Sequence, residues 1–179
     1  MRFVPILGFL LLVVALLLLL VARPPANTNV GDNVRPLPPL TLSPMKSGVA
    51  WDQKALVGHV TVLNFFASWC APCAAEMPDL VALHQQFPAV RIEGVVWNDD
   101  PATLGPWVKK NGHPFHALWL DTNGAATIAL GIKGIPETLI VDGQGRVRYR
   151  LAAPLTDSLR MEVIAPLLRA LLMEASHAP

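Results

Sequence analysis

Hydrophobic positions divide the chain into one long N-terminal apolar run and a series of shorter runs separated by polar turns. Residues 3–22 are almost entirely apolar and lie between Arg2 and Arg23. As a helix this run would be about 30 Å long, which matches the hydrocarbon thickness of a bilayer. It contains no clear small-x-small cleavage site. Residues 1–22 are therefore predicted to form an uncleaved transmembrane signal anchor.

Beyond the anchor, the pattern predicts a linker, one folded domain and a short tail. Residues 23–38 are rich in Pro and Asn with little periodicity, which indicates an extended linker. Residues 39–175 alternate strand-like and helix-like runs, and residues 176–179 remain as a tail. Alternating strands and helices, followed by a hairpin and a helix, predict an α/β domain with a mixed central sheet covered by helices on both faces.

The individual elements follow from periodicity and turn residues. A short strand or hairpin is expected within 40–58. The later strands are expected at 60–66, 91–97, 116–120, 138–141 and 146–151, the last two as a hairpin. Helices are expected from the cysteine pair to about 87, over 102–110, before 131, and from an N-cap at 156 to about 174.

Composition and charge narrow the possible functions. The formal net charge is +1 and no long basic or acidic block is present, so nothing indicates nucleic-acid binding. The chain has only two cysteines, both in one short motif, so no other disulfide can form within a monomer. The fold must depend on its hydrophobic core.

The motif Trp69–Cys70–Ala71–Pro72–Cys73 directly follows the buried strand and opens a helix. Pro72 is tolerated only in a helix's first turn, which places Cys70 at or just before the N-terminus. There the free amide groups and the helix dipole favour a thiolate. Cys73 lies one turn further on, close enough for a short-loop disulfide. We expect Cys70 to be the nucleophile and Cys73 the resolving thiol of a redox-active pair.

Two alternatives to a redox-active pair remain open for the cysteines. A purely structural disulfide, in a bare binding domain, would gain little stability because the loop is so short. A zinc module could use Cys70, Cys73, His113 and His116, although the long gap between the two pairs is unlike that of a zinc finger. A zinc assay on the purified protein would separate that reading from the redox one.

The cysteine motif after a hydrophobic strand resembles the active site of the thioredoxin superfamily. Residues 131–138, 140–142 and 148–150 narrow the resemblance to the membrane-anchored thiol:disulfide interchange proteins of cytochrome c maturation, the CcmG/DsbE family. It covers roughly residues 37–172 and implies a thioredoxin-like fold with an N-terminal extension.

The resemblance also implies further site residues. In the superfamily a cis proline, here Pro136 after Ile135, faces the disulfide, and its loop pairs with the substrate. Trp69 would shield one side of the sulfurs, and Glu137 would lie near them as a candidate proton acceptor. Trp69, Ile135 and Glu137 would line the substrate groove. The alternatives without a role in the reaction are that Pro136 only begins a strand, that Trp69 only packs, and that Glu137 is only a surface charge.

Glu76 and Asn64 mark a departure from general thioredoxins. Those proteins carry a buried acid where this chain has Asn64, whereas the subgroup resembled here has an acid at the position of Glu76. Glu76 could take the proton of Cys73 one turn away, or simply favour the helix dipole.

The resemblance implies a periplasmic reductant held in the inner membrane by a single span. It would keep the haem-attachment cysteines of apocytochrome c, or those of a partner thiol protein, reduced. A membrane thiol–disulfide electron donor would re-reduce it, and no cofactor beyond the Cys70–Cys73 pair is expected. No histidine lies between the cysteines, which favours a reducing pair. A general envelope reductase, or an oxidant of exported proteins, is the alternative.

Overall fold

The structure is a computed structural model that describes residues 12–14, 34–46 and 51–176. Residues 12–14 are helical, and the rest of the anchor predicted for 1–22 lies outside the described residues. Within the described ranges, no helix is long and apolar enough to span a bilayer. Most of the predicted linker also lies outside them, as do residues 177–179 of the predicted tail.

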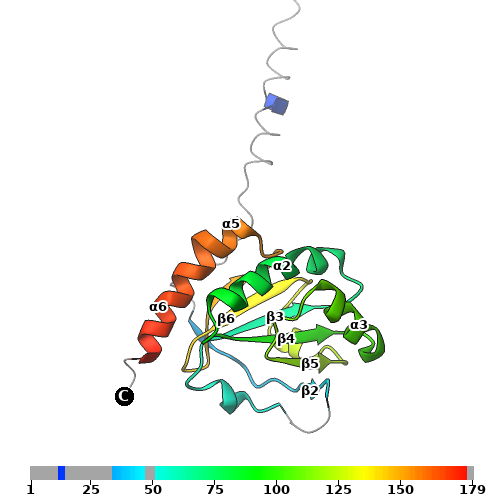
Figure 1. The fold of residues 1–179 in the computed structure, drawn as a ribbon, viewed down its shortest axis with the longest axis horizontal. Helices are drawn as coiled ribbons and strands as arrows, with labels where there is room; N and C mark the ends of the chain where they lie inside the picture. The colour runs from blue at the N-terminus through cyan, green and yellow to red at the C-terminus, as the bar shows by residue number, and fades with distance from the viewer. Residues whose placement is uncertain (1–11, 15–33, 47–50, 177–179) are drawn as a thin grey trace, which may run out of the picture.

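Seven strands form one mixed sheet in the order β1-β7-β6-β3-β4-β5-β2 (Figure 1). The three strands β3, β4 and β5 run parallel, and the other four pair antiparallel. The mixed sheet expected from the sequence is confirmed. The strands are β1 (Arg35–Pro36), β2 (Ser43–Pro44), β3 (Thr61–Phe66), β4 (Arg91–Trp97), β5 (Ala117–Asp121), β6 (Glu137–Val141) and β7 (Arg146–Leu151).

Helical elements pack against both faces of the sheet. One face holds the larger core cluster and is covered by α2 (Ala71–Gln86), α3 (Pro101–Asn111) and α6 (Ala165–Ser176). The opposite face is covered by α4 (Ala125–Ala129) and the 3-10 turn η1 (Gln53–Leu56), together with buried leucines from the segment before η1.

Strand β3 is the centre of the fold. All six of its residues are buried, because β4 and β6 flank it and helical elements cover both of its faces. A continuous apolar run is what such a doubly covered strand requires. Since the cysteine motif follows Phe66 after only a few residues, β3 anchors the site to the buried centre of the sheet.

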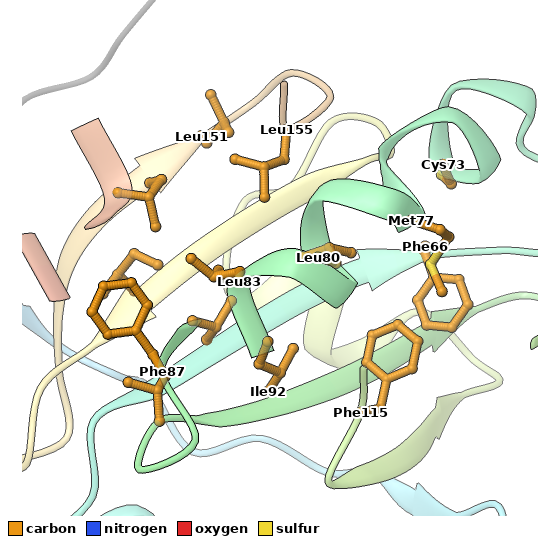
Figure 2. Packing of buried hydrophobic residues seen from close by; sticks show 14 of the residues in the cluster. Phe66, Cys73, Met77, Leu80, Leu83, Phe87, Ile92, Phe115, Leu151 and Leu155 are labelled. Atoms are coloured by element: carbon orange, nitrogen blue, oxygen red, sulfur yellow. The ribbon is translucent and has the colours of Figure 1, made fainter. Parts of the chain in front are cut away.

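Helix α2 rests on the sheet through one apolar face. Cys73, Met77, Leu80 and Leu83 are buried along it, and Figure 2 shows their side chains lying over the sheet. Pro78 lies inside this helix, which still continues to Gln86. The predicted helix after the motif is therefore confirmed.

The C-terminal helix is less regular than the sequence suggested. Thr156 caps it as predicted, accepting a bond from Leu159 N, but the helix consists of α5 (Asp157–Leu159), the π-turn η2 (Arg160–Ile164) and α6. Pro166 has no N–H to donate, and the wider π-turn ends two residues before it.

The end of the predicted linker packs onto the sheet. Strand β1 pairs Arg35 with Val147 of β7, and Leu37 is buried in the second core cluster. Proline at Pro36 is tolerated because β1 is an edge strand. The sheet thus begins within residues 23–38.

The segment 40–58 forms no hairpin within its described residues. Its strand β2 pairs instead with β5, at the far edge of the sheet. Trp51 packs edge-on against Trp119, with ring centroids 5.0 Å apart.

Candidate active site

Cys70 and Cys73 form a disulfide at the N-terminus of α2, with an S–S distance of 2.02 Å and a Cα–Cα distance of 5.2 Å. Cys70 is the N-cap, and its Sγ accepts the Cys73 amide at 3.2 Å. The predicted position of Cys70 and the predicted pairing are both confirmed. Cys70 is 5% exposed whereas Cys73 is fully buried, so an incoming thiol or disulfide meets Cys70 first.

Local sequence explains why the helix begins at this point. Pro72 occupies the first turn, where its missing N–H leaves no helical bond unmade. The amide of Cys73, which has no partner within the helix, donates to the sulfur of Cys70. This arrangement stabilises negative charge on Cys70 when the disulfide opens.

Glu76 lies one turn past Cys73 and is only 1% exposed. Its Oε2 accepts the amide of Leu155 at 2.8 Å, and its Oε1 accepts the side-chain amide of Asn64 at 2.9 Å. Burial raises the pKa of Glu76 to about 7, the two hydrogen bonds oppose that rise, and nearby Asp79 adds to it. Glu76 is therefore a buried acid that can take up or release a proton near neutral pH.

The peptide bond between Ile135 and Pro136 is cis, as the resemblance implied. It leads directly into β6, whose first residue Glu137 pairs with Phe65 near the end of β3. The cysteine motif follows the C-terminal end of β3, and the proline loop precedes the start of β6 beside it. The strand register therefore brings the proline loop and the cysteine pair to the same end of these two neighbouring strands.

Glu137 is buried rather than a plain surface charge. It forms an ion pair with Arg150, whose guanidinium also donates to the carbonyls of Leu130 and Gly131 at 2.9 and 3.0 Å. Burial raises the pKa of Glu137, and Arg150 opposes the rise. Glu137 lines an open groove of about 710 Å³ with residues of α4, β1 and β7. Glu137 therefore directly follows the cis proline in the chain while its side chain lines that groove.

Trp69 is held on the surface beside the disulfide. Its ring is 58% exposed, its Nε1 donates to the carbonyl of Asn98 at 3.1 Å, and its centroid lies 6.2 Å from that of Trp97. Asn98 has a positive φ of 46°, which an asparagine tolerates better than most residues. Trp69 is thus fixed by the loop that follows β4.

Sequence reasoning missed the residue that secures this loop. Asp99 accepts the Ser68 amide at 2.5 Å and the Ser68 hydroxyl at 2.9 Å, which ties the start of the cysteine motif to the end of β4. In the sequence, the Asn–Asp–Asp run after a buried strand predicts only a turn and a helix cap. Asp100 does cap α3, but nothing local in the sequence shows that Asp99 reaches back to Ser68.

The structure does not bring together the four residues of the zinc alternative. The sulfurs of Cys70 and Cys73 are bonded to each other. His113 and His116 instead line a separate cleft beside β2 and β5. Within the described residues, no three His, Cys, Asp or Glu side chains cluster as metal ligands would.

A mixed sheet that presents a helix-capping Cys–x–x–Cys disulfide beside a buried carboxyl group and a cis proline defines a thiol–disulfide oxidoreductase of the thioredoxin-like class. Residues 35–150 match the model of the AhpC/TSA family. The chain therefore belongs to that family.

Named relatives agree with this class. The thiol:disulfide interchange protein DsbE of Yersinia pestis is 34% identical over 177 residues, covering 93% of this chain and 91% of the relative. The thiol:disulfide interchange protein HelX of Rhodobacter capsulatus is 40% identical over 111 residues, which is 62% of each chain. A solved structure of a secreted Mycobacterium tuberculosis disulfide oxidoreductase, described as homologous to Escherichia coli DsbE, matches with a TM-score of 0.60 and 26% identity. That match covers 70% of this chain and 95% of the other.

Proposed function

We propose that this protein is a membrane-anchored periplasmic reductant of cytochrome c maturation. It would reduce disulfides between the haem-attachment cysteines of apocytochrome c, or those of a partner thiol protein. Haem attachment to Cys–x–x–Cys–His needs free thiols, which an oxidising compartment would otherwise close. The DsbE and HelX relatives and the sequence resemblance support this role.

The observation that carries the proposal is the buried carboxyl group of Glu76, one turn from Cys73. Negative charge in a buried site disfavours a second negative charge nearby. Glu76 therefore destabilises a thiolate on Cys73, one turn away, and so favours the disulfide form. A pair whose disulfide is favoured passes its electrons on, which suits a reductant.

The reaction proceeds through a mixed disulfide. The Cys70 thiolate attacks one sulfur of the substrate disulfide, a Cys70–substrate bond forms, and the first substrate thiolate leaves. Cys73 then gives its proton to Glu76 and attacks the Cys70 sulfur. The Cys70–Cys73 disulfide forms, and the second substrate thiolate leaves. The substrate gains the two electrons that the protein dithiol loses.

Re-reduction reverses these steps. A thiolate of a dithiol donor attacks Cys70, and Cys73 leaves as a thiolate that recovers a proton from Glu76. The second thiolate of the donor then attacks the donor sulfur bonded to Cys70, the donor disulfide forms, and Cys70 leaves as a thiolate. We propose a membrane thiol–disulfide protein as that donor, because the apolar segment 3–22 would hold this protein at the bilayer in which such a donor lies. Inner-membrane attachment predicts that the protein fractionates with membranes, and N-terminal sequencing that starts near Arg23 or beyond would contradict it.

Trapping of mixed disulfides tests the proposed substrate. Cys73→Ser leaves Cys70 able to attack but removes the resolving thiol, so partners should accumulate as disulfides to Cys70. We expect apocytochrome c or a thiol protein of its maturation among them. Cys70→Ser is the matched control and should trap none. If Cys73→Ser instead captures mainly unrelated exported proteins, the protein is a general envelope reductase.

A further inference from the structure

Asn64 connects three segments of the chain at the centre of the site. It lies in the middle of β3, fully buried, and pairs across the sheet with Thr138 of β6. Its amide Nδ2 donates to Glu76 Oε1 at 2.9 Å and to Thr138 Oγ1 at 3.1 Å. One amide group therefore joins the central strand, the strand after the cis proline and the helix that carries the disulfide.

We propose that Asn64 is a positioning residue for thiol–disulfide exchange, which Thr138 aligns so that its amide holds the Glu76 carboxylate in place and ionised beside Cys73. The proposal rests on the role of Glu76 proposed above and extends it to two residues that do not touch the sulfurs.

The geometry explains why an amide is used here rather than an acid. A carboxylate at position 64 would lie within hydrogen-bond distance of Glu76, and two buried carboxylates so close share one proton. The amide of Asn64 instead donates to Glu76 Oε1 and stabilises its charged form. Because the Leu155 amide donates to the other oxygen, both carboxylate oxygens are fixed.

Other charged groups do not replace this interaction. Asp79 of α2 repels the charge of Glu76, and it is itself paired with Arg160 of η2 at 3.1 Å. Glu137 precedes Thr138 in β6, so its side chain faces the other side of the sheet, where it pairs with Arg150. On α2, Cys73 is the remaining titratable neighbour, and it is the proton donor in the reaction. Asn64 and the Leu155 amide are thus the hydrogen-bond donors that the structure gives to Glu76.

A carbon-13 NMR titration of the Glu76 carboxyl, in the oxidised full-length protein, tests the proposal directly. Asn64→Leu keeps the size of the side chain but removes the donor. We expect the titration midpoint to rise by about one to two pH units, the usual worth of a hydrogen bond to a charged group. Thr138→Val, which frees the Asn64 amide without removing it, should raise the midpoint by about half a unit.

Thr61→Val is the matched control. Thr61 is also buried on β3, but its hydroxyl has no hydrogen-bond partner among the described residues, so the midpoint should not move. If Asn64→Leu fails to fold, the proposal is tested by comparing the Glu76 titration midpoint of Thr138→Val with that of Thr61→Val. An unchanged midpoint in the Asn64 and Thr138 variants would overturn the proposal.

The pH profile of substrate release from the mixed disulfide is the second readout. Its midpoint should rise together with the Glu76 titration in both variants. If the titration moves but the release profile does not, Glu76 is not the proton acceptor, and its proposed role fails along with that of Asn64. An unmoved titration contradicts only the contribution of Asn64, so the two failures are distinguishable.

Discussion

Replacing Glu76 by glutamine should make the stability of the oxidised protein, relative to wild type, increase as the pH rises from 4 to 8. In the folded protein the pKa of Glu76 lies at about 7, against an ordinary value of 4.5. A carboxyl group whose pKa rises on folding binds more protons in the folded state. Its contribution is therefore fully favourable below pH 4.5 and is lost as the pH rises through about 7.

The size of the effect follows from the two pKa values. The gap between 4.5 and about 7 corresponds to about 3 kcal/mol of stability. Between pH 4 and pH 8, the stability of Glu76→Gln relative to wild type should rise by roughly that amount. Some constant loss is expected at all pH values, because an amide cannot accept from both Asn64 and Leu155.

Urea unfolding of the oxidised protein at several pH values measures this difference. Glu162→Gln is the control, because Glu162 is exposed on η2 and its replacement should change stability by less than about 0.5 kcal/mol throughout. If the difference in free energy of unfolding between Glu76→Gln and wild type stays constant from pH 4 to pH 8, burial does not raise the pKa of Glu76 to near 7.

Two further predictions concern the cysteine roles and the packing under the site. In the reduced protein Cys70 should have a pKa below the free value of about 8.5 and should be alkylated fast at neutral pH, whereas Cys73 should react slowly. Fast alkylation that persists in Cys70→Ala but is lost in Cys73→Ala would reverse the assignment. Gly94→Ala should cost about 1–3 kcal/mol in urea unfolding, because its methyl group would lie 2.6 Å from a Leu118 methyl carbon. Gly105→Ala, in α3, meets nothing nearer than 4.0 Å and should be neutral or stabilising, so equal losses in both variants would contradict the packing argument.

Local pattern was enough to predict the elements that carry the cysteines. The strands β4 and β7 have the predicted bounds, and β3 begins one residue later than expected. These strands are rich in apolar residues and bounded by turn residues, so the local sequence alone determines where each strand begins and ends. Cys70 was placed at the helix start because Pro72 can occupy only the first turn.

The polar contacts that complete the site could not be predicted in the same way. Asn64 and Thr138 are separated by 74 positions, and Glu76 and Leu155 by 79. Such contacts depend on strand register and on where a distant loop returns to the sheet, and no local pattern encodes them. Glu76 was selected as a candidate from the resemblance, but its burial and its two partners required the structure.

The reduction potential of the Cys70–Cys73 pair tests the central claim most directly. The buried carboxyl group of Glu76 disfavours a thiolate on Cys73, and no histidine lies between the cysteines to stabilise the reduced form, so the pair should act as a reductant. Equilibration of the protein with glutathione or dithiothreitol buffers gives the potential. We predict a value nearer the roughly −270 mV of thioredoxin than the roughly −120 mV of a strong periplasmic oxidant, and a value close to −120 mV would contradict the reductant function.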